Sequence, residues 1–416
     1  MTGAPTITKS PPALIPPTEQ TPGGTLPLSS IDRDTGGAGL VNLIQVFPTS
    51  PLSAVTAMRD ALARALVPYY PVAGRVAPGG LAVDCTGEGV WFVEAAASCA
   101  LADVDRLERC PLPIPGELLL PRPPPGESHD GLIFMAQATR FACGGLAVGI
   151  SFSHAVFDGQ GVAQFLAAVG EMARGLPAPS VILVWGRDAI TDPPSPPPPQ
   201  LTELRLVTQV ADVSAESIAR VKDEFKASTG EEGQGCSTLD AVTAVVFKCR
   251  ALALAADDAA VRVAFAAGTR HLLHGVLPAV EGYYGNCVYL ACVARPGAAV
   301  REAALAELVG AVREAKEAVA AGFAGWMRGE VGRYDVPLDY RTVMVSDWSR
   351  LGFGEVDYGF GVPGYVFPLN DHGFVAAVNY VSPPAPRARS GGIRLVLRCV
   401  EEPHAAAFAA ELAKFA

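Results

Sequence analysis

A proline-rich run near the middle of the chain limits the folds that this sequence can adopt. Residues 191–200 read TDPPSPPPPQ, and such a run forms an extended spacer that cannot pack into a hydrophobic core. The chain has 416 residues, whereas a single hydrophobic core stops growing near about 250–300 residues. The sequence therefore predicts an N-terminal domain over residues 1–188, a crossover linker over 189–202 and a C-terminal domain over 203–416.

The composition indicates a folded protein and excludes several kinds of partner. Hydrophobic residues make up 50% of the chain and charged residues only 18%, which is too apolar for a disordered chain. A net charge of −10 argues against a surface that binds nucleic acid or anionic membranes. No apolar run reaches about 18 residues, and residues 1–5 do not read as the start of a secretory signal. We therefore expect a cytoplasmic protein without a membrane span.

The cysteines and histidines show no pattern for binding a metal. Nine cysteines are present and none forms a C-x-x-C pair, so we expect reduced thiols rather than disulfides or a zinc site. The six histidines contain no H-E-x-x-H or i, i+4 pair, which are the usual ligand spacings on a helix. We therefore expect no metal site.

Both halves of the chain mix strand patterns with helix patterns, which indicates an α/β fold. The first 40 residues are rich in proline, threonine and serine and read as an extended arm. Strands are expected at 40–47, 132–141, 146–153, 203–210, 261–267 and 286–293, and helices at 52–66, 161–174, 214–226, 237–255 and 300–321.

One histidine stands where an acid–base catalyst can work. His154 follows the predicted strand 146–153 and begins the sequence His-Ala-Val-Phe-Asp-Gly. A histidine at the end of a rigid strand suits general base catalysis, because free histidine, with a pKa near about 6.5, is mostly neutral at cytosolic pH. Asp158 either bonds the imidazole or fixes the loop. The structural alternative is that His154 ends a strand and Asp158-Gly159 turns the chain into a helix.

A second motif in the last third of the chain lowers the weight of that alternative. Residues 357–361 read DYGFG, and residues 345–348 read VSDW. Together with H-x-x-x-D-G at 154–159, they make the chain resemble the plant BAHD acyltransferases, whose second motif is usually D-F-G-W-G. Further blocks that look like this family lie at 69–75, 237–241 and 270–286. The resemblance covers nearly the whole chain.

The resemblance implies two chloramphenicol-acetyltransferase-like α/β domains, with mixed sheets, flanking helices and an active-site channel at the domain interface. Such folds exchange segments between domains, so a linear division near residue 190 is approximate. The implied reaction moves an acyl group from a coenzyme A thioester to an alcohol or amine. Acyl-CoA is then a co-substrate, no cofactor is bound permanently, and we expect a monomer acting on small molecules.

The resemblance also implies roles for the reacting groups. His154 removes the proton of the acceptor hydroxyl, and no covalent intermediate on the enzyme is needed. Ser346 and the indole N–H of Trp348 are the expected donors to the tetrahedral oxyanion.

Other residues of the two motifs are expected to be structural. Asp158 holds its loop by pairing with an arginine, and Asp357 is expected to pair with Arg270. The motif glycines that belong to this structural set are Gly159, Gly359 and Gly361.

Coenzyme A carries phosphates, which an acidic protein must meet with local cations or with amide groups at a helix start. Ser237 and Thr238 begin a predicted helix, and we expect them to contact the phosphates or the pantetheine. Lys222 and Lys226 are close in sequence, and a solvated helix face is the preferred interpretation for both.

Several substrates and two other functional classes stay open. Residues 7–12, 28–32 and 345–348 look most like grass members of the family that couple p-coumaroyl-CoA to monolignols, so transfer to coniferyl or sinapyl alcohol is preferred. The alternative is hydroxycinnamoyl transfer to shikimate, quinate or an amine, with Arg350 holding a carboxylate. A serine hydrolase is disfavoured because residues 149–153 lack the last glycine of G-x-S-x-G. A non-catalytic binding protein is disfavoured by the presence of both His154 and Asp158.

Overall fold

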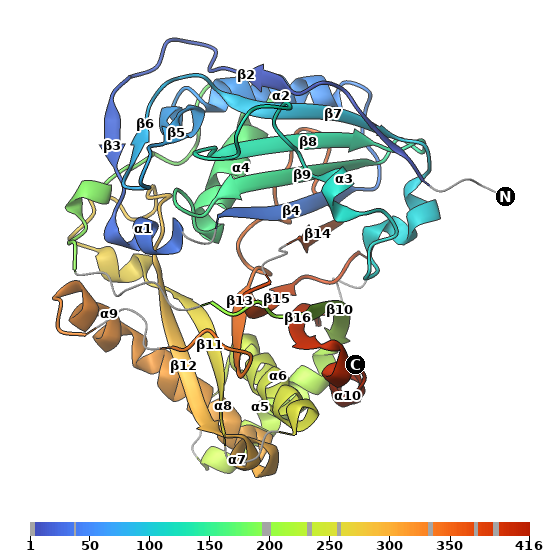
Figure 1. Cartoon of the computed structure of the whole chain (residues 1–416), viewed down its shortest axis with the longest axis vertical. Helices are drawn as coiled ribbons and strands as arrows, with labels where there is room; N and C mark the ends of the chain where they lie inside the picture. Colours follow the sequence, from blue (N-terminus) through green and yellow to red (C-terminus); the bar gives the residue numbers. More distant parts are fainter. Residues whose placement is uncertain are drawn as a thin grey trace. The chain divides into compact units, whose positions relative to one another are not determined.

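The computed structural model describes residues 5–36, 39–193, 201–230, 235–255, 259–331, 336–369, 373–385 and 391–416. Two units are present (Figure 1). Unit 1 comprises Met1–Asp192, Arg270–Cys287 and Arg350–Asn370, and unit 2 comprises Pro193–Thr269, Val288–Ser349 and Asp371–Ala416. Most of the expected proline spacer, residues 194–200, and His372 lie outside the described residues.

The division of the chain differs from the linear one expected at residues 189–202. Two segments from the second half, Arg270–Cys287 and Arg350–Asn370, belong to unit 1. The physical reason is strand pairing, because residues Tyr365–Pro368 form an antiparallel ladder with Leu40–Phe47. The DYGFG motif therefore lies in unit 1, and not with the rest of the C-terminal half.

Unit 1 is built on a mixed seven-stranded sheet with the order β1-β7-β8-β9-β4-β14, to which β2 is added beside β7. The pairing of β7 with β8 is parallel, and the other pairings in this sheet are antiparallel. These strands are β1 (Ile7–Lys9), β2 (Ala13–Ile15), β4 (Leu40–Phe47), β7 (Val90–Ala97), β8 (Phe134–Arg140), β9 (Leu146–Ser153) and β14 (Tyr365–Pro368). A second, small sheet contains β3 (Thr25–Pro27), β5 (Arg75–Val76) and β6 (Ala82–Asp84).

Strand β9 is buried along its whole length, as expected for a strand covered on both faces. On one side the short helix α3 (Gly116–Leu119) comes so close that a Cβ on Gly149 would lie 2.0 Å from the carbonyl oxygen of Leu119. On the other side, helices α2 (Ala54–Ala65) and α4 (Gly159–Ala173) pack against each other. Glycine at this central position thus permits tight packing of the strand that leads to His154.

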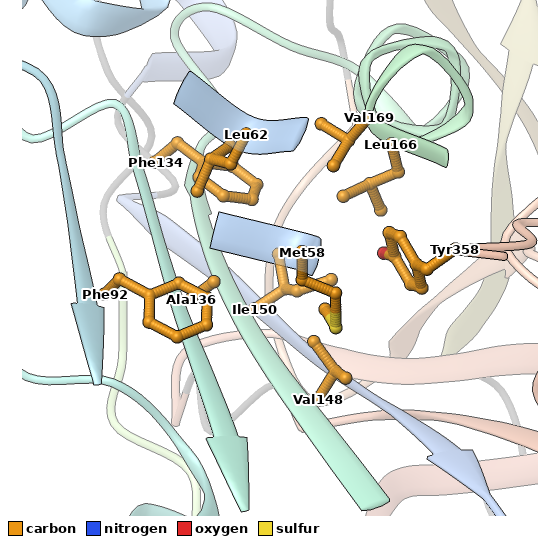
Figure 2. Close-up of a pocket in the computed structure, with 10 residues that line it drawn as sticks. All are labelled: Met58, Leu62, Phe92, Phe134, Ala136, Val148, Ile150, Leu166, Val169 and Tyr358. Carbon is orange, nitrogen blue, oxygen red and sulfur yellow. The ribbon is translucent and has the colours of Figure 1, made fainter. Parts of the chain in front are cut away.

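The side chains between these helices and the sheet enclose a cavity of about 20 Å³ (Figure 2). That volume is about what one water molecule needs, but a buried water also needs two or more polar partners. The lining is apolar except for the hydroxyl of Tyr358, and this hydroxyl donates to Gln45 Oε1 at 2.9 Å. The cavity is therefore a packing gap of the core and not a substrate pocket.

The Tyr358–Gln45 bond explains why tyrosine stands at the second position of the DYGFG motif. Gln45 is fully buried, and its Nε2 donates to the carbonyl oxygen of Phe353 at 2.8 Å. Changing Tyr358 to Phe leaves Gln45 Oε1 without this donor, so we expect the free energy of unfolding to fall by about 1–3 kcal/mol. Urea denaturation measures the loss. The double variant Tyr358→Phe/Gln45→Met should recover part of it, and equal stability of Tyr358→Phe and wild type would contradict the assignment.

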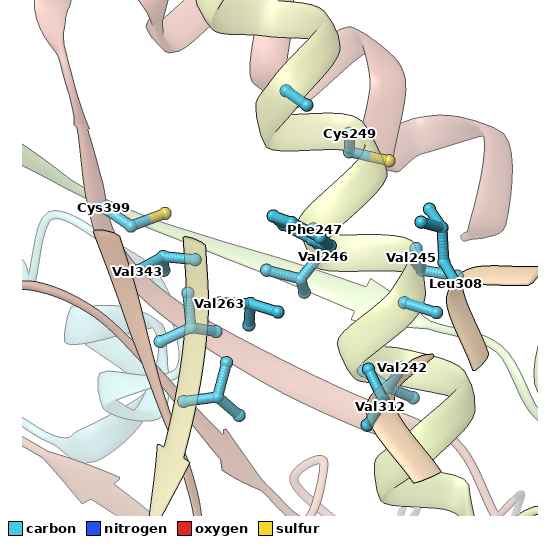
Figure 3. Packing of buried hydrophobic residues seen from close by; sticks show 14 of the residues in the cluster. Val242, Val245, Val246, Phe247, Cys249, Val263, Leu308, Val312, Val343 and Cys399 are labelled. Carbon is cyan, nitrogen blue, oxygen red and sulfur yellow. The ribbon is translucent and has the colours of Figure 1, made fainter. Parts of the chain in front are cut away.

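Unit 2 is built on a six-stranded sheet with the order β10-β16-β15-β13-β11-β12. The strands are β10 (Leu206–Val213), β11 (Ala260–Gly268), β12 (Val288–Pro296), β13 (Thr342–Asp347), β15 (Ala376–Val381) and β16 (Ile393–Glu401). The helices are α5 (Ala215–Thr229), α6 (Thr238–Leu254), α7 (Gly297–Glu302), α8 (Leu305–Glu317), α9 (Val319–Met327) and α10 (Glu402–Leu412). Helix α6 packs against α5, α8 and α10. Its Val246 faces Val263 of β11 and Val343 of β13, whereas Val242 and Val245 lie beside Leu308 and Val312 of α8 (Figure 3).

The observed elements confirm the predicted α/β class and correct two local expectations. The long helix expected over 300–321 is divided among α7, α8 and α9. Ala303 and Ala304 adopt extended backbone angles between α7 and α8, and α8 meets α9 at Ala318. The arm also contains a helix that was not expected, α1 (Ser30–Gly36). It begins with the reciprocal bonds of a capping box, in which Asp32 N donates to Ser29 Oγ and Ser29 N donates to Asp32 Oδ2. Among the described residues, no helix is both long enough and apolar enough to cross a membrane.

Candidate active site

His154 lies directly after β9, at the start of a turn that leads into α4. Its backbone N–H donates to the carbonyl oxygen of Gly39 at 3.1 Å, and the N–H groups of Val156 and Phe157 donate to Ser153 O. The residue is half-buried. Its backbone is thus fixed by the end of the strand, while part of the side chain stays accessible.

The imidazole of His154 faces the side chain of Asn286, with 3.1 Å between Nδ1 and Oδ1. Both protons of Asn286 Nδ2 have acceptors, Asp32 Oδ1 at 2.8 Å and the carbonyl oxygen of His154 at 2.8 Å. The amide group is therefore oriented with its oxygen toward Nδ1, an assignment made from its hydrogen-bond partners. An acceptor at this place requires a proton on Nδ1, so in neutral imidazole the lone pair is on Nε2.

Asp32 is fully buried and holds Asn286 from the far side. Its Oδ1 also accepts from the backbone N–H of Asn286 at 2.9 Å, and its Oδ2 accepts from the Nε of Arg187 at 2.9 Å. Burial lowers the pKa of Arg187, but Asp32 together with Tyr283 and Tyr284 raises it by more, so the pKa lies above its ordinary value. Arg187 therefore carries its charge inside unit 1.

Asp158 is buried and caps α4, because its Oδ1 accepts from the N–H of Gly161 at 2.7 Å. Arg270 Nη2 donates to both carboxylate oxygens, at 3.1 and 3.2 Å, and Cys287 N–H donates to Oδ2 at 3.0 Å. Burial lowers the pKa of Arg270, but Asp158 together with Cys287 and Tyr283 raises it by more, so the guanidinium is charged. The expected pairing of Asp158 with an arginine is present.

The expected pairing of Asp357 with Arg270 is wrong, because Arg270 is bound to Asp158. Asp357 Oδ1 instead accepts from the N–H groups of Gly359 at 2.8 Å and Gly361 at 2.9 Å. Burial pushes the pKa of Asp357 up, but these backbone bonds and the nearby Arg174 lower it below the ordinary value. Gly359 and Gly361 have φ angles of +89° and +102°, which favour glycine. Asp357 thus folds its own loop.

Gly159 begins α4, where a Cβ would lie 2.5 Å from Leu351 Cδ1. Gly161 is more tightly confined, because a Cβ there would lie 2.0 Å from the carbonyl oxygen of Tyr284. The first turn of α4 therefore packs directly on the segment that carries Asn286.

Ser346 and Trp348 lie in unit 2, at the end of β13 and just after it. The indole N–H of Trp348 donates to Ser346 Oγ at 3.0 Å. Its backbone N–H donates to Tyr380 O at 2.8 Å. The two side chains were expected to act as parallel donors, but the indole points at the serine. Because the indole N–H donates to Ser346 Oγ, the serine O–H is the donor of the pair that can bind another acceptor.

Ser237 and Thr238 stand at the start of α6 in unit 2. Ser237 is the N-cap, and its hydroxyl accepts from Asp240 N–H at 3.2 Å. Thr238 Oγ1 accepts from Lys222 Nζ at 3.0 Å, and Asp240 Oδ1 accepts from Lys316 Nζ at 2.6 Å. Lys222 was expected on a solvated helix face, but it reaches this helix start. Lys316 of α8 is a second cation at the same place.

The residues that sequence reasoning did not connect with His154 are Asp32, Arg187 and Asn286. Asp32 and Asn286 were part of blocks that resemble a known family, but no role was attached to them. Arg187 gave no signal in the sequence. A capping-box pattern at Ser29–Asp32 was the one local sign that Asp32 is held in a fixed place.

The fold defines a class, the two-domain α/β proteins with mixed sheets and flanking helices. The structure matches crystalline vinorine synthase with a TM-score of 0.77 and 21% sequence identity, over 99% of this chain and 98% of that one. This likeness confirms the predicted fold class.

Sequence comparisons identify the family within that class. The model of the Transferase family matches residues 6–411. Acyl transferase 4 of Oryza sativa subsp. japonica is 41% identical, covering 97% of this chain and 96% of the relative. Myricetin 3-O-glucosyl 1,2-rhamnoside 6'-O-caffeoyltransferase AT2 of Crocosmia x crocosmiiflora is 38% identical, covering 99% of each. The chain belongs to this family, the plant BAHD acyltransferases, and is an acyltransferase.

Proposed function

We propose that the protein transfers the p-coumaroyl group from p-coumaroyl-CoA to the hydroxyl of a monolignol, coniferyl or sinapyl alcohol, with His154 as the general base. The observation that carries the chemical part is the contact of His154 Nδ1 with Asn286 Oδ1 at 3.1 Å. A proton on Nδ1 leaves Nε2 with the lone pair that a base needs.

The reaction proceeds in a ternary complex of enzyme, thioester and alcohol. Nε2 of His154 takes the hydroxyl proton while the alcohol oxygen attacks the thioester carbon and a tetrahedral oxyanion forms. When this intermediate collapses, the carbon–sulfur bond breaks and the imidazolium returns the proton to the departing thiolate. The products are the ester and free coenzyme A, and the histidine regains its starting state.

Ser346 is the proposed donor to the oxyanion, with Trp348 acting through it. The indole N–H already donates to Ser346 Oγ, so it polarises the serine O–H and does not itself contact the substrate oxygen. Changing Ser346 to Ala should lower kcat by about 10²-fold, near the lower end of what one oxyanion donor contributes. Trp348→Phe should lower kcat less, because the serine O–H remains. Steady-state kinetics on both variants tests this, and wild-type kcat in Ser346→Ala would exclude the role.

The start of α6 is the proposed contact for the phosphates of coenzyme A. A helix N-terminus attracts anions, and Lys222 of α5 and Lys316 of α8 lie within hydrogen-bond distance of the first residues of α6. Since Ser237 Oγ already caps the helix, Thr238 and Lys222 are better placed than Ser237 to meet a phosphate oxygen.

The choice of donor and acceptor rests on sequence likeness. A 38% identical relative is named a caffeoyltransferase, and caffeoyl and p-coumaroyl are both hydroxycinnamoyl groups. Residues 7–12, 28–32 and 345–348 favour monolignols as acceptors. Arg350 is exposed and keeps shikimate or quinate as the second candidate, because a guanidinium can bind their carboxylate. Monomeric state and cytoplasmic location stay predictions.

A substrate panel tests the proposal. The protein is incubated with acetyl-, malonyl-, benzoyl- and p-coumaroyl-CoA, each with coniferyl alcohol, sinapyl alcohol, shikimate, quinate and an aromatic amine. Release of free thiol and the product mass are followed. We expect p-coumaroyl esters of the two monolignols to form with the highest kcat/KM. Faster acylation of shikimate would overturn the acceptor assignment, and a trapped acyl-serine would overturn the mechanism.

A further inference from the structure

We propose that Asp32 is a positioning residue for the reaction: its buried carboxylate, paired with Arg187, fixes the Asn286 carboxamide so that His154 keeps its proton on Nδ1. This inference rests on the proposed role of His154 as base. It extends that role to an ion pair that does not touch the substrate.

Asp32 determines the orientation of the Asn286 amide. In the observed orientation, Nδ2 donates to Asp32 Oδ1 and to His154 O, while Oδ1 faces His154 Nδ1. A 180° flip would set the amide oxygen against a carboxylate and a carbonyl, which are both acceptors only. Asp32 therefore makes one amide orientation much better than the other, and this orientation selects the tautomer of His154.

The Asp32 carboxylate is itself held rigidly. Its Oδ2 accepts from Ser29 N–H at 3.1 Å, Ser29 Oγ–H at 2.7 Å and Arg187 Nε at 2.9 Å. Both side chains of the ion pair have 0% exposure, so water does not compete for these bonds. With Oδ2 held in this way, Oδ1 is directed at Asn286, where it accepts from the backbone N–H and from the side-chain Nδ2.

Arg187 links the ion pair to the turn of His154. Arg187 Nη2 donates to the carbonyl oxygen of Val156 at 2.6 Å, two residues after His154. The guanidinium also lies 3.8 Å from the ring centroid of Trp185, which fixes its plane. Asp32 and Arg187 thus hold the backbone of the turn and the partner of the imidazole together.

During catalysis no proton moves to Asp32, because the carboxamide between them cannot relay one. Asn286 Oδ1 accepts from Nδ1–H in both the imidazole and the imidazolium. The charge of Asp32 on the far side of the amide is balanced by the Arg187 guanidinium, so the pair acts on His154 through the orientation of the amide. A neutral acceptor at position 32 would keep this orientation.

Nitrogen NMR of histidine tests the proposal without reference to turnover. The full-length protein is labelled with ¹⁵N-histidine, and the His154 signals are assigned by comparison with His154→Gln. Protonated and unprotonated ring nitrogens have clearly separate shifts. We expect neutral His154 to show one tautomer, with its proton on Nδ1. A proton on Nε2 in the wild type overturns the proposal, whatever the variants show.

Two double variants separate positioning from stability. Asp32→Asn/Arg187→Met keeps an oxygen that can accept from Asn286 and leaves no unpaired guanidinium. Asp32→Leu/Arg187→Met removes that oxygen. We expect the asparagine variant to retain the Nδ1–H tautomer and most of kcat. The leucine variant should show mixed tautomers and a kcat lower by about tenfold to a hundredfold, which is less than the 10²–10⁴ of a general base, with little change in KM.

The controls make each outcome decisive. Asp212→Asn breaks an ion pair with Arg394 in unit 2, and should lower stability without altering the His154 spectrum. Equal spectra and equal kcat in the two double variants would overturn the proposal. If the leucine variant does not fold, mixed tautomers in the asparagine variant would overturn it and a single Nδ1–H tautomer would support it. If His154→Gln keeps its turnover, the proposed function fails, while the spectra still report on the Asp32 contact.

Discussion

Replacing His154 by Gln is expected to lower kcat by about 10²–10⁴-fold, the usual contribution of a general base. Glutamine has a similar reach and can still donate to Asn286 Oδ1, so the local fold should persist. It has no basic nitrogen, and the acceptor hydroxyl must then attack without losing its proton to the enzyme. The KM for acyl-CoA should change little, because this substitution leaves the start of α6 intact. Thiol release under saturating substrates measures the loss.

A matched control for this variant is His129→Gln, since His129 is exposed in a loop of unit 1. Its kcat and melting temperature should equal those of the wild type. If His154→Gln also keeps the wild-type kcat, another group removes the proton. If His154→Gln also lowers the melting temperature, kcat is compared at a temperature well below the melting transition of both proteins.

Removing the Asp158 carboxylate should destabilise unit 1 by about 3–5 kcal/mol, the usual cost of breaking one side of a buried ion pair. In Asp158→Ala, the Arg270 guanidinium stays buried, with 10% of its side chain exposed, and loses its counter-charge. The N–H groups of Gly161 and Cys287 lose their acceptor as well. Urea denaturation followed by circular dichroism measures the change in the unfolding free energy.

A double-mutant cycle assigns the loss to the pair. Asp158→Ala/Arg270→Met has no unpaired buried charge, so its loss should be clearly smaller than the sum of the two single losses. Glu307→Gln serves as the exposed control, since its ion pair with Arg295 is partly solvated and should contribute about 0–1 kcal/mol. Additive losses in the cycle, or a loss under about 1 kcal/mol for Asp158→Ala, would contradict the structural role.

Much of the local structure could be predicted from short patterns. The strand over 40–47 has the predicted bounds, and the strand before His154 ends at Ser153 as expected. These strands could be predicted because each is marked by an alternating or continuous apolar run of adjacent residues. The helix α1 was missed because prolines and small polar residues around it hide a capping box. The break at Ala303–Ala304 within the helix expected over 300–321 was missed, because nothing in the apolar pattern signals it.

The partners of the site could not be predicted in the same way. Arg270 is separated from Asp158 by 112 positions and from Asp357 by fewer, and the chain gives no local reason to prefer either. In the structure Arg270 pairs with Asp158, while the carboxylate of Asp357 accepts from N–H groups of its own loop. The contact of Asn286 with Asp32 spans 254 positions. Only the folded unit brings such residues together.

The discontinuous course of unit 1 has a consequence for how the protein is made. Translation releases the chain from its N-terminus, so His154 leaves the ribosome well before Asn286, and β4 leaves before its partner β14. Domains commonly fold in order of synthesis, but unit 1 cannot complete its sheet or its histidine contact until the later segments have emerged. The nascent N-terminal half therefore carries an unpaired edge at β4 until β14 emerges, and unpaired strand edges are prone to aggregate.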